Sequence, residues 1–207
     1  MKALEWIKFL ETQKTLHGKV LFRVAELSNV SGRAPHALNV EVARLVTKGI
    51  LARYAAGVYG LPGAVTPEQL VATIDADAYI TGMFAMYRHN LVTQAPTVIT
   101  CFTNRRHNRS RLRSTPLGRL EFVCVNDHVY ARPSNGRIAP PEQALCDLAH
   151  MAKRRGLNQA NLVTFRGLHR LNRKKLAGIA RRYSASVGAF LKGLAPPESD
   201  LEPGKKN

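Results

Sequence analysis

The sequence, 207 residues long, is poor in the patterns that hold metals and cofactors. Its three cysteines, Cys101, Cys124 and Cys146, lie far apart, and no CxxC pair or His/Cys cluster has a zinc-site spacing. There is also no glycine-rich loop of the kind that cradles phosphates. We therefore expect no metal ion and no cofactor, and we expect the cysteines to act as small buried side chains in a reducing compartment.

Long apolar segments are missing as well. No run of about 18 consecutive apolar residues occurs, so no membrane-spanning helix is expected. Residues 1–6 include a Lys and a Glu and have no apolar core, which is unlike a signal peptide. These absences predict a cytoplasmic protein without a membrane partner.

Acidic residues are scarce: 14 Asp and Glu stand against 31 Lys and Arg, for a formal net charge of +17. Such an excess predicts a polyanionic partner, most commonly nucleic acid, although a solvated basic surface on an ordinary enzyme stays open. Residues 64–100 hold one Arg against three acids, whereas residues 101–137 hold eight Arg against two. Since the acidic stretch follows the turn residues Pro62 and Gly63, we place a domain boundary after residue 63.

The segment before that boundary, residues 1–63, begins with two predicted helices. Leu4, Ile7 and Leu10 stand three apart, which indicates the apolar face of an amphipathic first helix. A short second helix is expected over residues 23–28, and a glycine-containing turn follows it.

A third helix begins at Pro35, whose fixed backbone suits a first helical turn. Its apolar residues have the spacing of a buried stripe: Leu38, Val42, Leu45 and Val46. Residues 50–54 and 58–61 flank a glycine-containing turn and predict a hairpin of two short strands. Helix, turn, helix and hairpin in this order are typical of a winged helix-turn-helix domain, which we predict for residues 1–63.

The face of the third helix opposite the stripe is predicted to enter the major groove of DNA, where Arg reads guanine and Asn reads adenine. The hairpin would touch phosphates, which set position rather than sequence. The residues expected to contact DNA are Arg23, Arg33, His36, Asn39, Arg44, Lys48, Arg53 and Tyr54. A winged helix used only for protein contacts is the alternative, and the positive charge argues against it.

A second domain, residues 64–194, is predicted to be mixed α/β, which places the chain in the α+β class. Its expected helices are one that starts at Thr66 and Pro67, one that ends at Asn90, and those over residues 137–150, 158–170 and 173–193. Its expected strands cover residues 97–103 and 118–125. The polar, proline-rich residues 195–207 are predicted to be a flexible tail.

A basic segment, residues 104–113, separates the two expected strands. Its arginines are Arg105, Arg106, Arg109, Arg111 and Arg113. Three interpretations stay open: an extension of the DNA-binding surface, a contact with an acidic or nucleic-acid-bound partner, or a solvated loop.

No catalytic residue is assigned from the sequence. Glu142 and Asp147 lie five apart on one expected helix, a spacing that puts them on different faces. We interpret Glu142 as a helix-start charge and Asp147 as a structural hydrogen-bonding group. His89 could titrate near neutral pH, but a packing role at a helix end is favoured. No Ser or Cys stands in a nucleophile motif, so the chain is not expected to be an enzyme.

Two patches carry a more specific signal: YITGMFAMYRHNLVTQAP over residues 79–96, and PEQALCD over residues 141–147. Together they resemble the AbiE-type antitoxins (AbiEi-like proteins) of type IV toxin–antitoxin systems. In that family a winged helix precedes a domain with a Tyr-Ile-Ser-Gly-like helix, a Gln-x-Pro strand start and a Pro-Glu-x-Ala-Leu-x-Asp helix. The order of elements agrees over about residues 1–194, while Asn90 stands where Gly is usual and Phe84 where a small or polar residue is usual.

This resemblance implies two activities. The N-terminal domain would bind inverted repeats in the operon's own promoter and repress transcription, and the C-terminal domain would counteract a nucleotidyltransferase-like toxin in phage abortive infection. The expected partners are then double-stranded DNA and that toxin. Two alternatives are a standalone DNA-binding transcriptional regulator without a toxin, and an RNA-binding or nucleic-acid-modifying protein.

Overall fold

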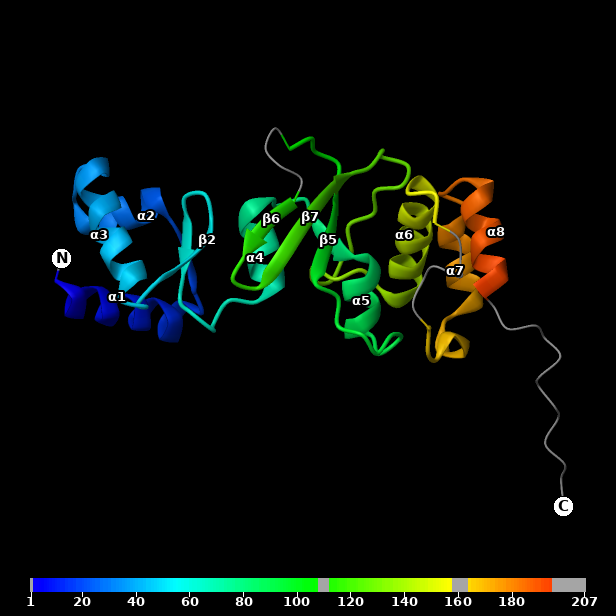
Figure 1. The fold of residues 1–207 in the computed structure, drawn as a ribbon, viewed down its shortest axis with the longest axis horizontal. Coiled ribbons are helices and arrows are strands. Elements are labelled where there is room, and N and C mark those ends of the chain that lie inside the picture. The colour runs from blue at the N-terminus through cyan, green and yellow to red at the C-terminus, as the bar shows by residue number, and fades with distance from the viewer. Residues whose placement is uncertain (1, 108–111, 158–163, 195–207) are drawn as a thin grey trace, which may run out of the picture.

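Helices and two β-sheets make up the computed structural model, a mixed α+β fold in which residues 2–107, 112–157 and 164–194 are described. The elements follow one long axis, from α1, α2 and α3 at one end to α7 and α8 at the other (Figure 1). The predicted tail, residues 195–207, lies outside the described residues. The expected α+β class is confirmed at this level.

The N-terminal elements alternate helices with the strands of a small sheet. They are α1 (Ala3–His17), β1 (Leu21–Arg23), α2 (Val24–Ser31), α3 (Pro35–Thr47), β2 (Ala52–Ala55) and β3 (Val58–Gly60). The three strands are antiparallel in the order β1-β3-β2. Gly18 ends α1 in the left-handed conformation, with φ 61°, and its N–H donates to the carbonyl oxygen of Lys14.

Two details of this segment differ from the sequence-based expectation. The strand β1 was not predicted, because three residues are too few to display a period, and its pairing with β3 sets its conformation. The first helix is rotated, since Leu4 is 62% exposed while Trp6 and Leu10 are buried. The large indole and the side chain one turn later make the core face, because residues four apart lie on the same side of a helix.

The C-terminal elements surround a second sheet. They are α4 (Pro67–Ile74), β4 (Tyr79–Thr81), α5 (Gly82–Arg88), β5 (Val98–Thr103), β6 (Leu112–Thr115), β7 (Gly118–Cys124), α6 (Pro141–Arg154), the 3-10 helix η2 (Leu168–Arg170), α7 (Arg173–Ala180) and α8 (Ala185–Leu194). The strand order is β4-β5-β7-β6, with β5 and β7 parallel and the two outer pairs antiparallel.

Two predictions of where helices begin and end in this segment are confirmed. The hydroxyl of Thr66 accepts a hydrogen bond from the backbone N–H of Gln69 at 3.2 Å, which caps α4 as its sequence predicts. Asn90 has φ 57° just after α5, the left-handed conformation expected at a helix end.

Longer predictions were less accurate. The helix expected over residues 173–193 is two helices, α7 and α8, broken around Tyr183. Of the helix expected over residues 158–170, residues 158–163 lie outside the described part, and the remainder holds the short η2. The strand β6 occupies the end of the predicted basic segment, where pairing with β7 decides the structure.

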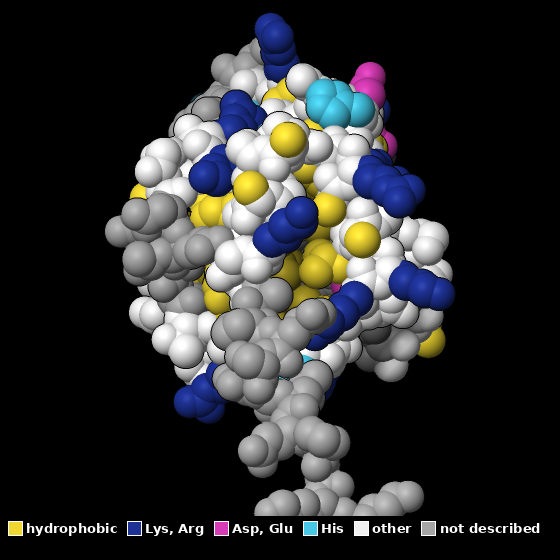
Figure 2. Space-filling model, turned by 90° about the vertical axis from the view of Figure 1, so that its right-hand side faces the viewer, with side chains coloured by type: hydrophobic (Ala, Val, Ile, Leu, Met, Phe, Trp, Pro, Cys, Tyr) yellow, Lys and Arg dark blue, Asp and Glu magenta, His cyan; other side chains and the backbone are white. Residues whose placement is uncertain are grey.

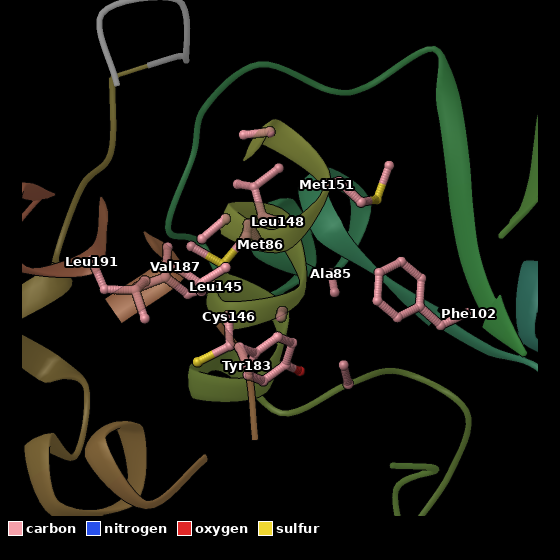
Figure 3. Packing of buried hydrophobic residues seen from close by; sticks show 14 of the residues in the cluster. Ala85, Met86, Phe102, Leu145, Cys146, Leu148, Met151, Tyr183, Val187 and Leu191 are labelled. Atoms are coloured by element: carbon pink, nitrogen blue, oxygen red, sulfur yellow. The ribbon is translucent and has the colours of Figure 1, made fainter. Parts of the chain in front are cut away.

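The apolar core divides into three clusters. The first joins Trp6 and Leu10 to α3, and the second joins hairpin residues such as Tyr54 to the second sheet, so it spans the predicted boundary after residue 63. The third lies around α6, where Leu145, Leu148 and Met151 pack with α5, β5, Tyr183 and α8 (Figure 3). The division into two domains stays a prediction.

Candidate nucleic-acid interface

The helix α3 turns one face to the core and the other to solvent. Leu38, Val42 and Leu45 are at most 3% exposed, which confirms the predicted stripe, and Val46 is partly buried. The side chains exposed on the helix are His36, Ala37, Asn39, Val40, Ala43, Arg44, Thr47 and Lys48. Burial of the stripe therefore decides which side chains a partner can reach.

The sequence reasoning named His36 at the centre of this exposed face but missed the other side chains there. His36, Val40, Ala43 and Thr47 repeat at the i, i+4, i+7 spacing and lie directly opposite the buried stripe. Asn39 lies on one flank of this row and Arg44 on the other. Val40 is 43% exposed, and an apolar contact of this kind is what the methyl group of thymine offers in the major groove.

Glu41 is the acid of α3, and it faces inward. Its Oε1 accepts a hydrogen bond from Nε1 of the buried Trp6 at 2.7 Å, and its Oε2 lies 3.1 Å from Nε of Arg33. Burial alone would raise the pKa of Glu41, but hydrogen bonds to its carboxylate, first among them that from Trp6, and nearby positive charge that includes Arg33 hold this pKa below its usual value. The carboxylate is thus ionised and engaged away from the row centred on Val40.

Three of the predicted contact residues come together. Arg33, Arg44 and Lys48 line one shallow hollow between α3 and the start of α1. The side chain of Arg33 is about half exposed despite its ion pair. A positive edge thus borders the exposed row on the side of α1.

Arg23 lies elsewhere than the other predicted contacts. Its backbone N–H donates to Glu26 at 2.7 Å, at the start of α2, and its guanidinium donates to the carbonyl oxygen of Thr73 in α4. This side chain therefore connects the first sheet to α4.

The hairpin of β2 and β3 exposes one of its two predicted contact residues and buries the other. Arg53 is exposed, but Tyr54 is only 2% exposed, so the expectation of an exposed Tyr54 is wrong. Successive side chains of a strand point to opposite faces, so Tyr54 points into the second cluster, where its hydroxyl donates to the carbonyl oxygen of Leu61 at 3.3 Å. Burial raises the pKa of Tyr54.

Two arginines of the basic segment, residues 104–113, contact other side chains of the protein. Arg105 pairs with Asp77 at 2.6 Å, and Arg113 lies 3.0 Å from Nδ1 of His107 and stacks 5.0 Å from the centre of the Phe122 ring. Arg106 is exposed, and Arg109 and Arg111 lie outside the described residues. The side chain of Arg105 is still 66% exposed, and the three interpretations of the segment stay predictions.

The carboxylate of Asp75 anchors the start of this segment. It is 5% exposed and accepts hydrogen bonds from the Thr103 hydroxyl at 2.7 Å and from Nε2 of His107 at 3.0 Å. Burial alone would raise the pKa of Asp75, but these two bonds and the backbone N–H of Asp77 lower it. The ionised carboxylate thereby fixes the end of β5 against the loop before β4.

The carboxylate of Asp147 is the most deeply buried acid of the second segment. It accepts hydrogen bonds from the hydroxyls of Tyr79 at 3.2 Å, Thr81 at 2.7 Å and Tyr183 at 2.5 Å. Burial raises the pKa of Asp147 to about 6, although the three hydroxyl donors oppose that rise. Asp147 is thus a structural hydrogen-bonding group, as predicted, and it is 0% exposed.

The other two residues considered for catalysis, Glu142 and His89, form hydrogen bonds with backbone atoms. Glu142 accepts from the backbone N–H of Asn172 at 3.1 Å and pairs with Lys175 at 3.1 Å, so it connects α6 to the start of α7. Nε2 of His89 lies 2.8 Å from the carbonyl oxygen of Ala139, which is the expected packing role at a helix end.

Within residues 2–107, 112–157 and 164–194, no group of three or more His, Cys, Asp or Glu side chains could hold a metal ion. In the same part of the chain, no helix is long and apolar enough to cross a membrane.

The chain matches no protein-family model, and no curated protein is detectably similar to it.

Proposed function

We propose that the protein is a DNA-binding repressor of its own promoter, with residues 1–63 acting as a winged helix. In this proposal α3 is the recognition helix and the hairpin of β2 and β3 is the wing. The observation that carries the proposal is the outer face of α3, which presents Asn39 and Arg44 while its one acid, Glu41, is turned to Trp6. The net charge of +17 supplies the attraction to phosphates.

The chemistry of the exposed face fits duplex DNA. A helix enters the major groove, where Arg and Asn make paired hydrogen bonds to guanine and adenine and a small apolar side chain contacts thymine. Arg33 and Lys48, on the edge next to α1, are suited to phosphates of the flanking strand. Arg53 on the hairpin is suited to a further phosphate.

The test is titration of the full chain with labelled DNA from upstream of its own gene, followed by fluorescence anisotropy. Arg44→Ala should weaken binding about tenfold, the loss expected for one base-reading pair. Lys174→Ala is the matched control, because Lys174 is an exposed cation on α7, at the other end of the molecule (Figure 1). Equal affinities of the two variants would contradict the recognition-helix assignment, and equal binding of RNA of the same sequence would favour an RNA-binding protein.

The antitoxin part of the proposal comes from the resemblance to AbiE-type antitoxins. One observation supports treating its two patches as a unit: Tyr79 and Thr81 of the first patch donate hydrogen bonds to Asp147 of the second. In this proposal the C-terminal segment counteracts a nucleotidyltransferase-like toxin, and no catalysis by this chain is required.

Growth of cells that express the neighbouring gene, with and without this protein, tests the antitoxin part. Rescue of growth by Arg44→Ala, a variant expected to lose repression, would separate the two activities. A point variant is preferable to deletion of residues 1–63, because that deletion removes Tyr54 and Val58 from the second cluster. A neighbour that is harmless alone, or toxicity that persists, would favour the standalone regulator.

A further inference from the structure

An apolar groove opens at the end of the molecule opposite α3. It has a volume of about 650 Å³ and lies between η2, α7 and α8, with Leu145 of α6 among its lining residues. Its other large apolar lining residues are Leu168, Leu171, Leu176, Tyr183, Leu191 and Leu194. Figure 2 shows hydrophobic side chains gathered in a hollow on this end of the molecule. A hollow of this size is in the range of binding sites.

The rim of the groove is positively charged. Arg173 and Arg181 lie at the two ends of α7, Lys192 lies near the end of α8, and His169 belongs to η2. Lys and Arg side chains surround the hollow in Figure 2. The described lining residues include no Asp or Glu. An occupant that complements the groove therefore has apolar side chains flanked by carboxylates.

The spacing of the charges selects the shape of the occupant. Arg173 and Arg181 are eight residues apart, which corresponds to about 12 Å along a helix at 1.5 Å per residue. The apolar anchors of a helix at positions i, i+4 and i+7 span about 10 Å. An amphipathic helix can therefore bury three side chains along α7 and α8 while its acids reach both ends of the rim. A compact anion would reach one end.

We infer that this groove binds an acidic amphipathic helix of a partner protein. The inference does not depend on the DNA-binding proposal, because it uses a different face of the molecule and different residues. The apolar face of the helix packs on Leu176 and Leu191, and its flanking carboxylates pair with Arg173, Arg181 and Lys192.

The probe is a fluorescein-labelled synthetic helix of about 14 residues with Leu at i, i+4 and i+7 and Glu on both flanks. It is titrated with the full chain at physiological salt. A peptide of the same composition in scrambled order controls for attraction to the net charge of +17. The ordered peptide should bind at least tenfold tighter than the scrambled one, because only the ordered peptide presents an apolar face.

Two charge-reversal variants locate the binding. Arg181→Glu, at the rim, should weaken binding of the ordered peptide roughly fivefold or more. Lys174→Glu makes the same charge change on the same helix, outside the groove lining, and should leave the affinity unchanged. Ala177→Trp, which fills the groove from an exposed position on α7 without changing charge, should also abolish the preference for the ordered peptide.

Three results would overturn the inference: no binding of the ordered peptide, equal binding of the scrambled one, or equal losses in Arg181→Glu and Lys174→Glu. Sedimentation gives a further check. Self-association of the chain that Ala177→Trp abolishes would make the groove an interface between two copies. Promoter DNA binding, measured on the same variants, should stay unchanged, so a failure here is distinct from a failure of the proposed repressor function.

Discussion

The cluster around Trp6 and the cluster around Asp147 place their acids in opposite ways. Near Trp6, the buried side chains are all apolar, and the carboxylate of Glu41 lies at the edge, where it accepts the indole N–H. In the C-terminal cluster, the carboxylate of Asp147 is 0% exposed and three hydroxyls surround it. The solvent-exposed surfaces of the two regions differ as well: α3 exposes polar side chains around the small apolar residues Val40 and Ala43, whereas α7 and α8 form an apolar groove.

This difference explains where sequence patterns succeed. The helix α3 has one buried face, so its apolar residues recur at helical spacing and the exposed face can be read from the sequence. The helix α6 is buried from Glu142 to Ala149, polar residues included. A helix that is covered on all sides has no polar face to reveal its orientation, and the identity of the groups that bond to its acids comes from packing.

The largest expected effect comes from removing the carboxylate at the centre of the C-terminal cluster. Asp147→Ala leaves the hydroxyls of Tyr79, Thr81 and Tyr183 without their acceptor and should lower the free energy of unfolding by about 3 kcal/mol or more. Urea denaturation followed by circular dichroism measures this change. Asp127→Ala, at an exposed position, should change the free energy of unfolding by less than about 0.5 kcal/mol. Similar values for the two variants would contradict the role of Asp147 as the common acceptor of the three hydroxyls.

The raised pKa of the same group gives the C-terminal cluster a pH dependence of unusual sign. Because the pKa of Asp147 rises from 3.8 to about 6 on folding, the folded state binds its proton more tightly. Protonation of Asp147 therefore adds up to about 3 kcal/mol of stability, which is fully present below about pH 4 and is lost as pH rises through 6.

Asp147→Asn isolates this dependence, because the pKa values of Glu26, Glu41, Asp75 and Glu142 are lowered and these groups add stability as pH rises. The unfolding free energy of the natural protein minus that of the variant should fall between pH 4.5 and pH 7.5. A constant difference would show that Asp147 has an ordinary pKa.

A smaller effect is expected at the edge of the N-terminal cluster. Glu41→Ala removes the acceptor of the buried Trp6 indole N–H and the ion pair of Arg33, and should lower the free energy of unfolding by about 1–3 kcal/mol. The tryptophan fluorescence transition in urea reports this loss, since Trp6 is the one tryptophan of the chain. Glu11 is exposed on α1 and provides the matched control: Glu11→Ala should unfold at the same urea concentration as the natural protein.

The smallest effect distinguishes the two neighbouring side chains of the hairpin. Tyr54→Phe removes the hydroxyl that donates to Leu61 and should cost about 1 kcal/mol of stability without changing DNA affinity. Arg53→Ala should do the reverse: stability stays unchanged, and the salt dependence of DNA binding decreases by about one phosphate contact. Weaker DNA binding by Tyr54→Phe would show that the Tyr54 hydroxyl contacts DNA, contrary to its burial in this structure.

The sequence by itself determined the features whose causes are local. The stripe on α3, the left-handed residues Gly18 and Asn90, and the Thr66 cap follow from a helical period or from the chemistry of a single residue. The tertiary structure decided the inward turn of Tyr54, the hydroxyl donors of Asp147 and the groove between α7 and α8. Tyr79 is 68 residues from Asp147 along the chain, and pairing over such a separation depends on packing, which a pattern of a few residues does not encode.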